Sequence, residues 1–174
     1  MLRWVAAFVV LTRYVSSKAP DFGKYHTVTT NLTTCPNSPP DPFEMSLTWA
    51  RTKSGVDQFV LKYDLPKDIG PIGGSIRLMR WNNRSYVDVI HVKTKNICET
   101  FVIGKAIELW PKADSRCYFL KGNFTHKIVD GNRMAHMFLG TSLPYGRYMS
   151  KIELSYGKRF LGCRLIDGYL EPAK

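Results

Sequence analysis

The sequence predicts an all-β protein: an antiparallel sandwich or cup of two sheets with one short helix. Apolar residues recur at every second position in several segments, and short runs rich in glycine, proline and asparagine separate these segments. Only one segment shows helical spacing. Closely spaced strands with this alternation are typical of antiparallel sheets that bury one face.

The predicted strands follow in chain order from Phe43. Residues 43–49 and 59–65 alternate, and the polar segment 51–57 supplies the turn between them. Residues 75–81 and 85–92 form the next pair around a polar turn at 82–84, and the second of these is rich in β-branched residues. Two hairpins are therefore expected in the first half of the chain.

A third hairpin is predicted at the C-terminal end. Residues 147–156 alternate, and Gly157-Lys158 begins a turn. The return strand carries Leu161, Cys163 and Leu165 at alternate positions and stops at Pro172. A cysteine in such a strand is either an inert small hydrophobe or one end of a bridge to a distant segment.

Helical spacing is confined to residues 97–110, through Ile97, Phe101 and Lys105. Gly104 interrupts the pattern and Pro111 ends it, so we expect only one or two turns there.

The N-terminal residues predict a secretory signal. Arg3 precedes an apolar run of about eight residues, much shorter than the roughly 20 needed to span a bilayer, and small residues follow near Ser17. A buried N-terminal helix is the alternative, and Arg13 and Lys18 would flank it awkwardly. The expected organisation is a signal peptide at 1–17 and a single domain at 18–174, secreted to the extracellular space or the lysosomal lumen.

Charge and sequons agree with secretion. The full chain has a net charge of +11, and loss of the two signal arginines leaves about +9. This balance favours anionic lipids or glycans, whereas nucleic acid is a poor partner for a secreted chain. The basic residues are scattered, which is typical of a solvated face. Sequons predict glycosylation at Asn31, Asn83 and Asn123.

The chain has four cysteines, Cys35, Cys98, Cys117 and Cys163. In an oxidising compartment an even number predicts two disulfides, and the sequence leaves all three connectivities open. None has a cysteine or histidine within four residues, so no metal site is expected. No cofactor motif occurs either, because the glycine-rich segment 71–75 lacks the following Lys-Ser/Thr.

No catalytic signature stands out, and the prediction is a protein that is not an enzyme. Two segments begin like a nucleophile elbow but lack its second glycine, and the histidines are isolated. Pairs of carboxylates could serve a glycosidase, yet 14 acidic residues offer many accidental pairs.

Residues 132–146 combine apolar side chains with turn residues. Such a segment either fills the core or lines the mouth of a hydrophobic cavity and touches membrane. Methionine slightly favours the second interpretation, because its thioether adapts to varied ligands. The apolar residues concerned are Met134, Met137, Phe138, Leu139, Leu143 and Tyr145.

Residues 146–171 carry a family resemblance. They combine Gly146 and Tyr148, a strand, Ser-x-Gly-Lys-Arg at 155–159 and Leu-Gly-Cys at 161–163. Upstream, CYFLKGNFTH at Cys117, ICETF at Cys98 and TTCPNSPPDP around Cys35 add weaker matches. The chain thus resembles the ganglioside activator-like, MD-2-related (ML-type) lipid-recognition proteins, including the insect chemosensory B-type branch.

The resemblance implies an immunoglobulin-like lipid-binding cup, whose two splayed sheets enclose an apolar pocket. It implies disulfides Cys35–Cys163 and Cys98–Cys117. Two further disulfides of the activator protein have no counterpart here, which puts glycosidase activation in doubt. The candidate cavity and rim residues are Trp81, Phe101, Phe119, Phe124, Met134, Met137, Phe138, Leu139, Leu143, Tyr145, Tyr148, Ile152 and Leu154.

The predicted function is binding and transfer of a lipid or other hydrophobic ligand without catalysis, in an insect as part of chemosensation towards pheromones or cuticular lipids. The alternative is a protein that presents glycolipids to a lysosomal or extracellular hexosaminidase. Expected partners are therefore a hydrophobic small molecule, a transiently contacted membrane, and a glycosidase or chemoreceptor. A small secreted enzyme and an interaction module with a filled core are the rivals from other classes.

Overall fold

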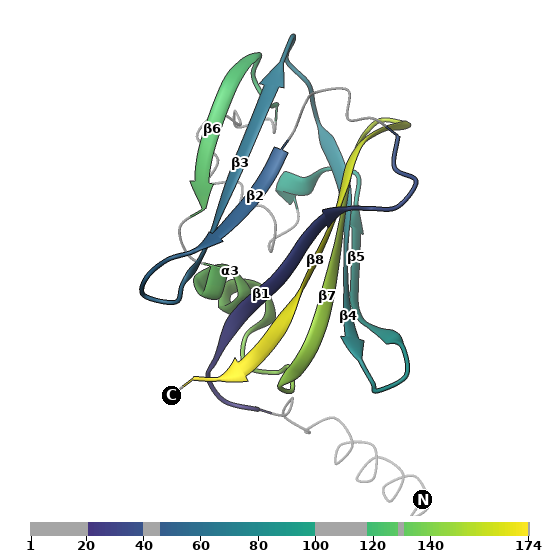
Figure 1. The fold of residues 1–174 in the computed structure, drawn as a ribbon. Coiled ribbons are helices and arrows are strands. Elements are labelled where there is room, and N and C mark those ends of the chain that lie inside the picture. Colours follow the sequence, from purple (N-terminus) through teal and green to yellow (C-terminus); the bar gives the residue numbers. More distant parts are fainter. Residues whose placement is uncertain (1–20, 40–45, 100–117, 129–130, 174) are drawn as a thin grey trace, which may run out of the picture.

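The described residues form two antiparallel sheets (Figure 1), which confirms the predicted fold class. The structure is a computed structural model and describes residues 21–39, 46–99, 118–128 and 131–173. The predicted signal at 1–17 lies outside these residues. Within them, no helix is long and apolar enough to cross a membrane.

The larger sheet has five strands in the order β1-β8-β7-β4-β5, and the smaller has three in the order β2-β3-β6. The larger sheet consists of β1 (Tyr25–Thr34), β4 (Ile72–Trp81), β5 (Tyr86–Thr94), β7 (Gly146–Tyr156) and β8 (Arg159–Pro172). The smaller sheet consists of β2 (Ser46–Arg51), β3 (Asp57–Leu65) and β6 (Gly122–Ile128). The helical elements within the described residues are a 3-10 turn, η1 (Ile97–Glu99), and a helix, α3 (Gly131–Leu139).

The three predicted hairpins are present. β2 pairs with β3, β4 with β5, and β7 with β8, each antiparallel. Sequence analysis predicted no strand at β1 or β6. β1 pairs with β8 along its whole length, so the first and last strands are neighbours in the five-stranded sheet.

The helix of the structure lies at a different place in the chain from the predicted one. The helix predicted at 97–110 begins as the 3-10 turn η1, and its continuation lies outside the described residues. Residues 131–139, interpreted from sequence as part of a loop, form the α-helix α3. Gly140 ends this helix with φ 55° and donates its N–H to the carbonyl of His136, which is a typical glycine cap.

The buried apolar residues form two clusters. The first joins both sheets and contains Tyr63, Leu65, Ile69, Ile72, Ile97, Phe119 and Leu161. The second contains Tyr25, Leu78, Leu143, Tyr148 and Leu170, none of which belongs to the three-stranded sheet. The sheets are therefore held together by apolar packing at one end, while α3 lies beside the other end, next to β1 (Figure 1).

Leu161 is fully buried in the first cluster, at 0% exposure. We expect Leu161→Ala to lower the free energy of unfolding by about 3 kcal/mol, because it removes buried methyl groups and leaves a cavity. Leu165, on the same strand but only partly buried, is the matched control. Leu165→Ala should cost about 1 kcal/mol in chemical denaturation, and equal losses for the two variants would contradict the assignment of Leu161 to the core.

Side chains from β2, β3 and α3 cap the free edge of β1. The Thr29 N–H donates to Asp57 Oδ2 at 2.6 Å, and the Thr27 N–H donates to Asn132 Oδ1 at 2.5 Å. Arg51 donates to the Thr29 carbonyl at 3.2 Å. An exposed strand edge invites pairing with another chain, so this cap both protects β1 and ties it to the smaller sheet and to α3.

Asp57 is the centre of this edge cap. Its side chain has 0% exposure and accepts hydrogen bonds from Arg51 Nε at 2.8 Å and from the Thr29 N–H. Burial by itself raises the pKa of Asp57, but the Arg51 and Thr29 donors outweigh it, so this pKa lies below its usual value. Asp57 is therefore a charged group that stabilises the junction between the sheets.

A disulfide joins Cys35 to Cys163. This bond confirms the Cys35–Cys163 pairing that the family resemblance implied. The two Cα atoms are 5.4 Å apart, and the Cys35 N–H donates to the Cys163 carbonyl. The bridge therefore fastens the segment after β1 to the middle of β8. Cys98 is also disulfide-bonded, and its expected partner Cys117 lies outside the described residues.

Candidate ligand-binding site

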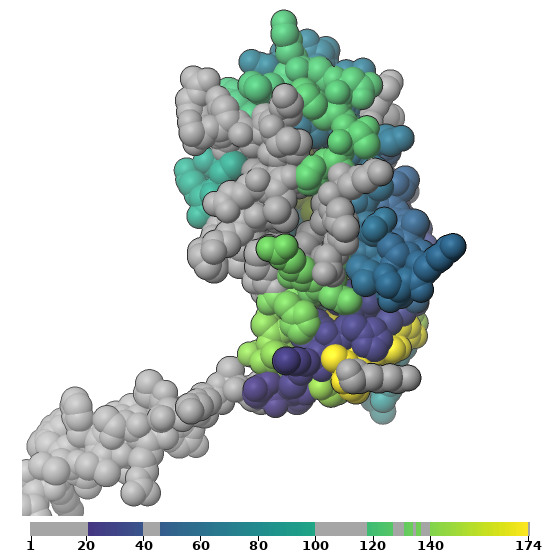
Figure 2. Space-filling view, turned by 90° about the vertical axis from the view of Figure 1, so that its left-hand side faces the viewer, coloured from purple at the N-terminus to yellow at the C-terminus, as the bar shows by residue number. Residues whose placement is uncertain are grey.

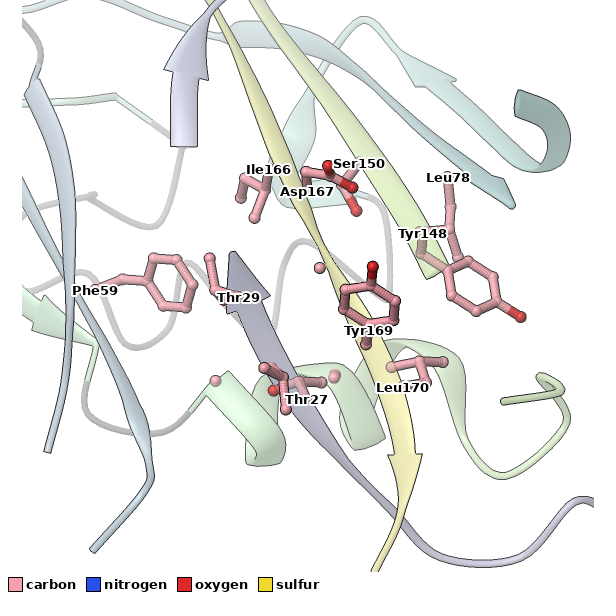
Figure 3. Close-up of a pocket in the computed structure, with 14 residues that line it drawn as sticks. Thr27, Thr29, Phe59, Leu78, Tyr148, Ser150, Ile166, Asp167, Tyr169 and Leu170 are labelled. Atoms are coloured by element: carbon pink, nitrogen blue, oxygen red, sulfur yellow. The ribbon is translucent and has the colours of Figure 1, made fainter. Parts of the chain in front are cut away.

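A cavity of about 130 Å³ lies between the two sheets, at the end where the second apolar cluster covers the larger sheet. Figure 3 shows Phe59 approaching it from β3, opposite β1 and β8, with α3 running below. The lining residues are Thr27, Val28, Thr29, Phe59, Leu78, Gly131, Ala135, Tyr148, Ser150, Ile166, Asp167, Gly168, Tyr169 and Leu170.

Strand register explains how one wall of the cavity is built. Leu78 on β4 lies opposite Ser150 on β7, which lies opposite Ile166 on β8. Directly opposed residues of antiparallel strands project from the same face, so these side chains form one row across the inner face of the larger sheet. The row is apolar at both ends and carries one hydroxyl in the middle.

Gly168 is required by the close approach of β1. The register of β1 and β8 shifts between Thr29 and Asn31, and a Cβ at Gly168 would lie 2.5 Å from the Val28 carbonyl oxygen. A side chain there would push β1 away from β8 and disturb the cavity wall.

The second wall comes from β3 and α3. Phe59 of β3 and Ala135 of α3 both line the cavity, and a Cβ added at Gly131, at the start of α3, would lie 3.1 Å from the Phe59 ring. Figure 2, which views the molecule from the side of β6, shows β6 in green at the top and the region of α3 lower down, beside the start of β1 in purple. The helix is therefore the element that covers the cavity where the smaller sheet does not.

Few polar groups of the cavity are ionisable near neutral pH. The Tyr148 hydroxyl donates to the Pro144 carbonyl at 2.6 Å, and burial raises the pKa of this phenol while Arg80 opposes the rise. Burial, with a smaller effect of Tyr148, raises the pKa of the neighbouring Tyr25 to about 12. In the described part of the chain, no three His, Cys, Asp or Glu residues are placed to hold a metal ion. The cavity is thus suited to an apolar guest.

The candidate residues predicted from sequence fall into separate places. Tyr148 lines the inter-sheet cavity, and Leu143 and Tyr145 pack in the second cluster beside it. Phe119 is buried in the first cluster, and Phe124 and Leu154 pack against that cluster. Those three therefore contribute to the core at the closed end of the sheets.

The remaining candidates lie elsewhere or are not described. Ile152 is half-buried on β7, opposite Ile76, and Trp81 lies at the end of β4 with its ring 5.2 Å from that of Tyr86. Phe101 lies outside the described residues. The side chains of Met134, Met137, Phe138 and Leu139 also lie outside them, although their backbone belongs to α3.

Several cavity residues were not singled out from sequence. Phe59, Leu78, Ile166 and Leu170 each line the cavity from a different position in the chain. Each of them lies in a segment with the period-two alternation of a strand. Which of these residues lie opposite one another depends on the register of the paired strands, and the sequence does not give that register. The three sequon asparagines, Asn31, Asn83 and Asn123, are all exposed, as glycosylation requires.

The fold and the cavity define a two-sheet antiparallel β-protein with an apolar hollow between its sheets. No family model matches the chain, and no curated protein matches it. Among solved structures, chicken MD-1 complexed with lipid IVa aligns with 90% of this chain and 100% of its own, at 14% identity and a TM-score of 0.43. The C-terminal domain of wzt aligns with 91% of this chain and 83% of its own, at 9% identity and a TM-score of 0.33. Both TM-scores lie below 0.5.

Proposed function

We propose that this chain is a secreted, non-catalytic protein that binds and transfers a lipid or another small hydrophobic molecule held between its sheets. The observation that carries the proposal is the cavity of about 130 Å³, whose walls include the apolar side chains of Phe59, Leu78 and Ile166. The disulfide Cys35–Cys163 supports an oxidising compartment, where such bonds persist.

The size of the cavity indicates which part of a ligand it holds. An apolar cavity of about 150 Å³ is large enough for benzene, so the present hollow accommodates a small apolar group or the end of a hydrocarbon chain. Each buried methylene contributes about 0.8 kcal/mol. A longer chain has to extend the hollow at the end covered by α3, because apolar packing of both sheets closes the opposite end.

Ala135 offers a direct test of this proposal, since it lines the cavity from α3. We expect Ala135→Leu to fill part of the hollow and to lower the affinity for a fluorescent fatty acid about tenfold or more, because the guest loses its apolar contacts. The measurement is a titration of the delipidated protein, followed by fluorescence.

The matched control is Ala50→Leu, which adds the same side chain at an exposed position of β2. This variant should bind the fatty acid like the wild type. If delipidated wild-type protein takes up none, or if both leucine variants bind equally well, ligand binding in this cavity is wrong.

Two finer roles are separated by a second assay. A chemosensory or transfer protein should move lipid between vesicles by itself, whereas a glycolipid-presenting protein should stimulate a hexosaminidase acting on glycolipid in detergent-free vesicles. We propose the first role, and the hollow between the sheets supports it because a guest enclosed there can be carried without a second protein.

A further inference from the structure

Ser150 places an unused hydroxyl in the wall of the inter-sheet cavity. It lies between Leu78 and Ile166 in the row across the inner face of the larger sheet (Figure 3). The residue is half-buried, and its Oγ has no hydrogen-bond partner within the described residues. Both neighbours in the row are apolar, so neither can supply such a partner.

Three other hydroxyls of the cavity wall are already engaged within the protein. Thr27 Oγ1 donates to Asn132 Oδ1 at 2.8 Å, and the Tyr148 hydroxyl donates to a backbone carbonyl at 2.6 Å. The Thr29 side chain forms a hydrogen bond with the Asp57 carboxylate. A guest in the cavity therefore meets these three hydroxyls with their partners in place.

Asp167 and Tyr169 direct their polar groups away from the cavity. Both alternate with the inward-facing positions of β8, so their side chains project from the outer face of the sheet. There the Asp167 carboxylate accepts hydrogen bonds from the Tyr86 hydroxyl at 2.9 Å and from Arg147 Nε at 3.2 Å. Among the lining residues that the structure describes, Ser150 is thus the one that offers a guest a free polar group.

The charge of the cavity wall limits what can lie beside this hydroxyl. The described lining residues include no lysine, arginine or histidine. A carboxylate or phosphate inside the cavity would therefore lack a counter-charge, and burial of an unpaired charge is very costly. A neutral hydroxyl or carbonyl group does not carry that cost. The guest group that matches Ser150 is therefore a neutral oxygen.

The Ser150 hydroxyl can discriminate between guests because it has to be desolvated when one binds. A hydrocarbon that covers the hydroxyl excludes water from it and offers no hydrogen bond in return, which lowers the affinity. A guest with an oxygen at this point replaces the lost hydrogen bond. Serine both donates and accepts, so the guest oxygen can belong to a carbonyl or to a hydroxyl group.

We propose that Ser150 determines the class of guest: a hydrophobic molecule with one neutral oxygen, as in an alcohol, a ketone or an ester, near the end that enters the cavity. Apolar pockets commonly use a few placed polar groups in this way to orient a ligand and to select it. The inference rests on the proposed function, because it requires a guest between the sheets, and it adds the chemistry of that guest.

The test compares 2-hexanone with hexane, two chains of equal length that differ by one carbonyl oxygen. Each compound is used to displace the fluorescent fatty acid from delipidated protein. We expect Ser150→Ala to lower the affinity for 2-hexanone about fivefold, since the hydrogen bond is lost, and to leave that for hexane unchanged or higher. The ratio of the two affinities should thus fall about fivefold to tenfold.

Ser75→Ala is the matched control. Ser75 lies on the neighbouring strand β4, and its Oγ donates to Glu153 Oε2 at 2.9 Å, away from the cavity. This variant should leave both affinities unchanged. Ser150→Thr retains the hydroxyl, so it should keep the wild-type ratio of the two affinities although its extra methyl group takes up space.

Failure of this inference differs from failure of the proposed function. Wild-type protein that takes up no fluorescent fatty acid would overturn both. Uptake of the fatty acid with the same affinity ratio in wild type and Ser150→Ala would overturn only the role of Ser150. If Ser150→Ala does not fold, the Ser150 Cβ resonance of the wild type decides the question. It should shift more with 2-hexanone than with hexane, and equal shifts contradict the proposal.

Discussion

Replacing both Cys35 and Cys163 by alanine is expected to lower the free energy of unfolding by about 4 to 5 kcal/mol. The bridge closes a loop with a sequence separation of 128 residues, and long loops lose the most chain entropy when they are cross-linked. Because β1 lies at the edge of the sheet and is paired on one side by β8, loss of the bridge also frees the C-terminal end of β1, which the edge cap at Thr27 and Thr29 does not hold. Chemical denaturation of the oxidised protein measures the effect.

Each single variant, Cys35→Ala or Cys163→Ala, breaks the same bond and serves as the control. The three variants should agree within about 1 kcal/mol, since the two changes share one interaction. A double variant as stable as the wild type would mean that the first and last strands stay together without the bridge.

Asp57→Asn is expected to lower the free energy of unfolding by about 3 kcal/mol. Donors from Thr29 and Arg51 surround this buried carboxylate, and an amide would point an N–H at them and leave Arg51 without its counter-charge. Arg51 is 39% exposed, so water partly compensates it and the loss stays at the lower end of the range for buried pairs.

Asp88→Asn is the matched control, because Asp88 is 53% exposed and lies 3.7 Å from Arg77. Exposed pairs contribute little, so this variant should lose less than about 1 kcal/mol. Similar losses at Asp57 and Asp88 in urea denaturation would show that the edge cap does not hold the sheets together.

The Asp57 variant also changes the dependence of stability on pH. Because the pKa of Asp57 is lower in the folded protein than in the unfolded chain, its contribution is complete above the unfolded value of 3.8. It is lost as the pH falls through the lower, folded value. The wild type should therefore lose stability more steeply than Asp57→Asn in that acid range.

The parts of the fold that were predictable are the strands with one buried face and one solvent-exposed face. The pairs β2 and β3, β4 and β5, and β7 and β8 all show period-two alternation with a short turn, so pattern alone located them. The disulfide Cys35–Cys163 was implied by the family resemblance rather than by the residues themselves.

The elements that were missed lack such a pattern. β1 contains only three apolar side chains, Tyr25, Val28 and Leu32, and the side chains of Asp57 and Asn132 accept hydrogen bonds from its free edge. α3 is short, and its capping glycine resembled a loop signal. β1 and α3 both depend on contacts with residues far away in the sequence, so a short stretch of sequence does not predict them.

The candidate site was less predictable than the strands. Leu78, Ser150 and Ile166 meet only because three separate strands pair in one register, and Ala135 reaches them from α3. The family resemblance placed Phe119 and Phe124 among the cavity candidates, but these residues pack in or against the closed end of the core instead.

The central claim is that the hollow between the sheets holds an apolar guest. Native mass spectrometry of the protein isolated from its own source, followed by organic extraction, tests it most directly. The account predicts a bound hydrophobic molecule in a one-to-one complex, and loss of that molecule in Ala135→Leu. A protein that carries no such molecule and regains none after incubation with lipid vesicles would contradict the account.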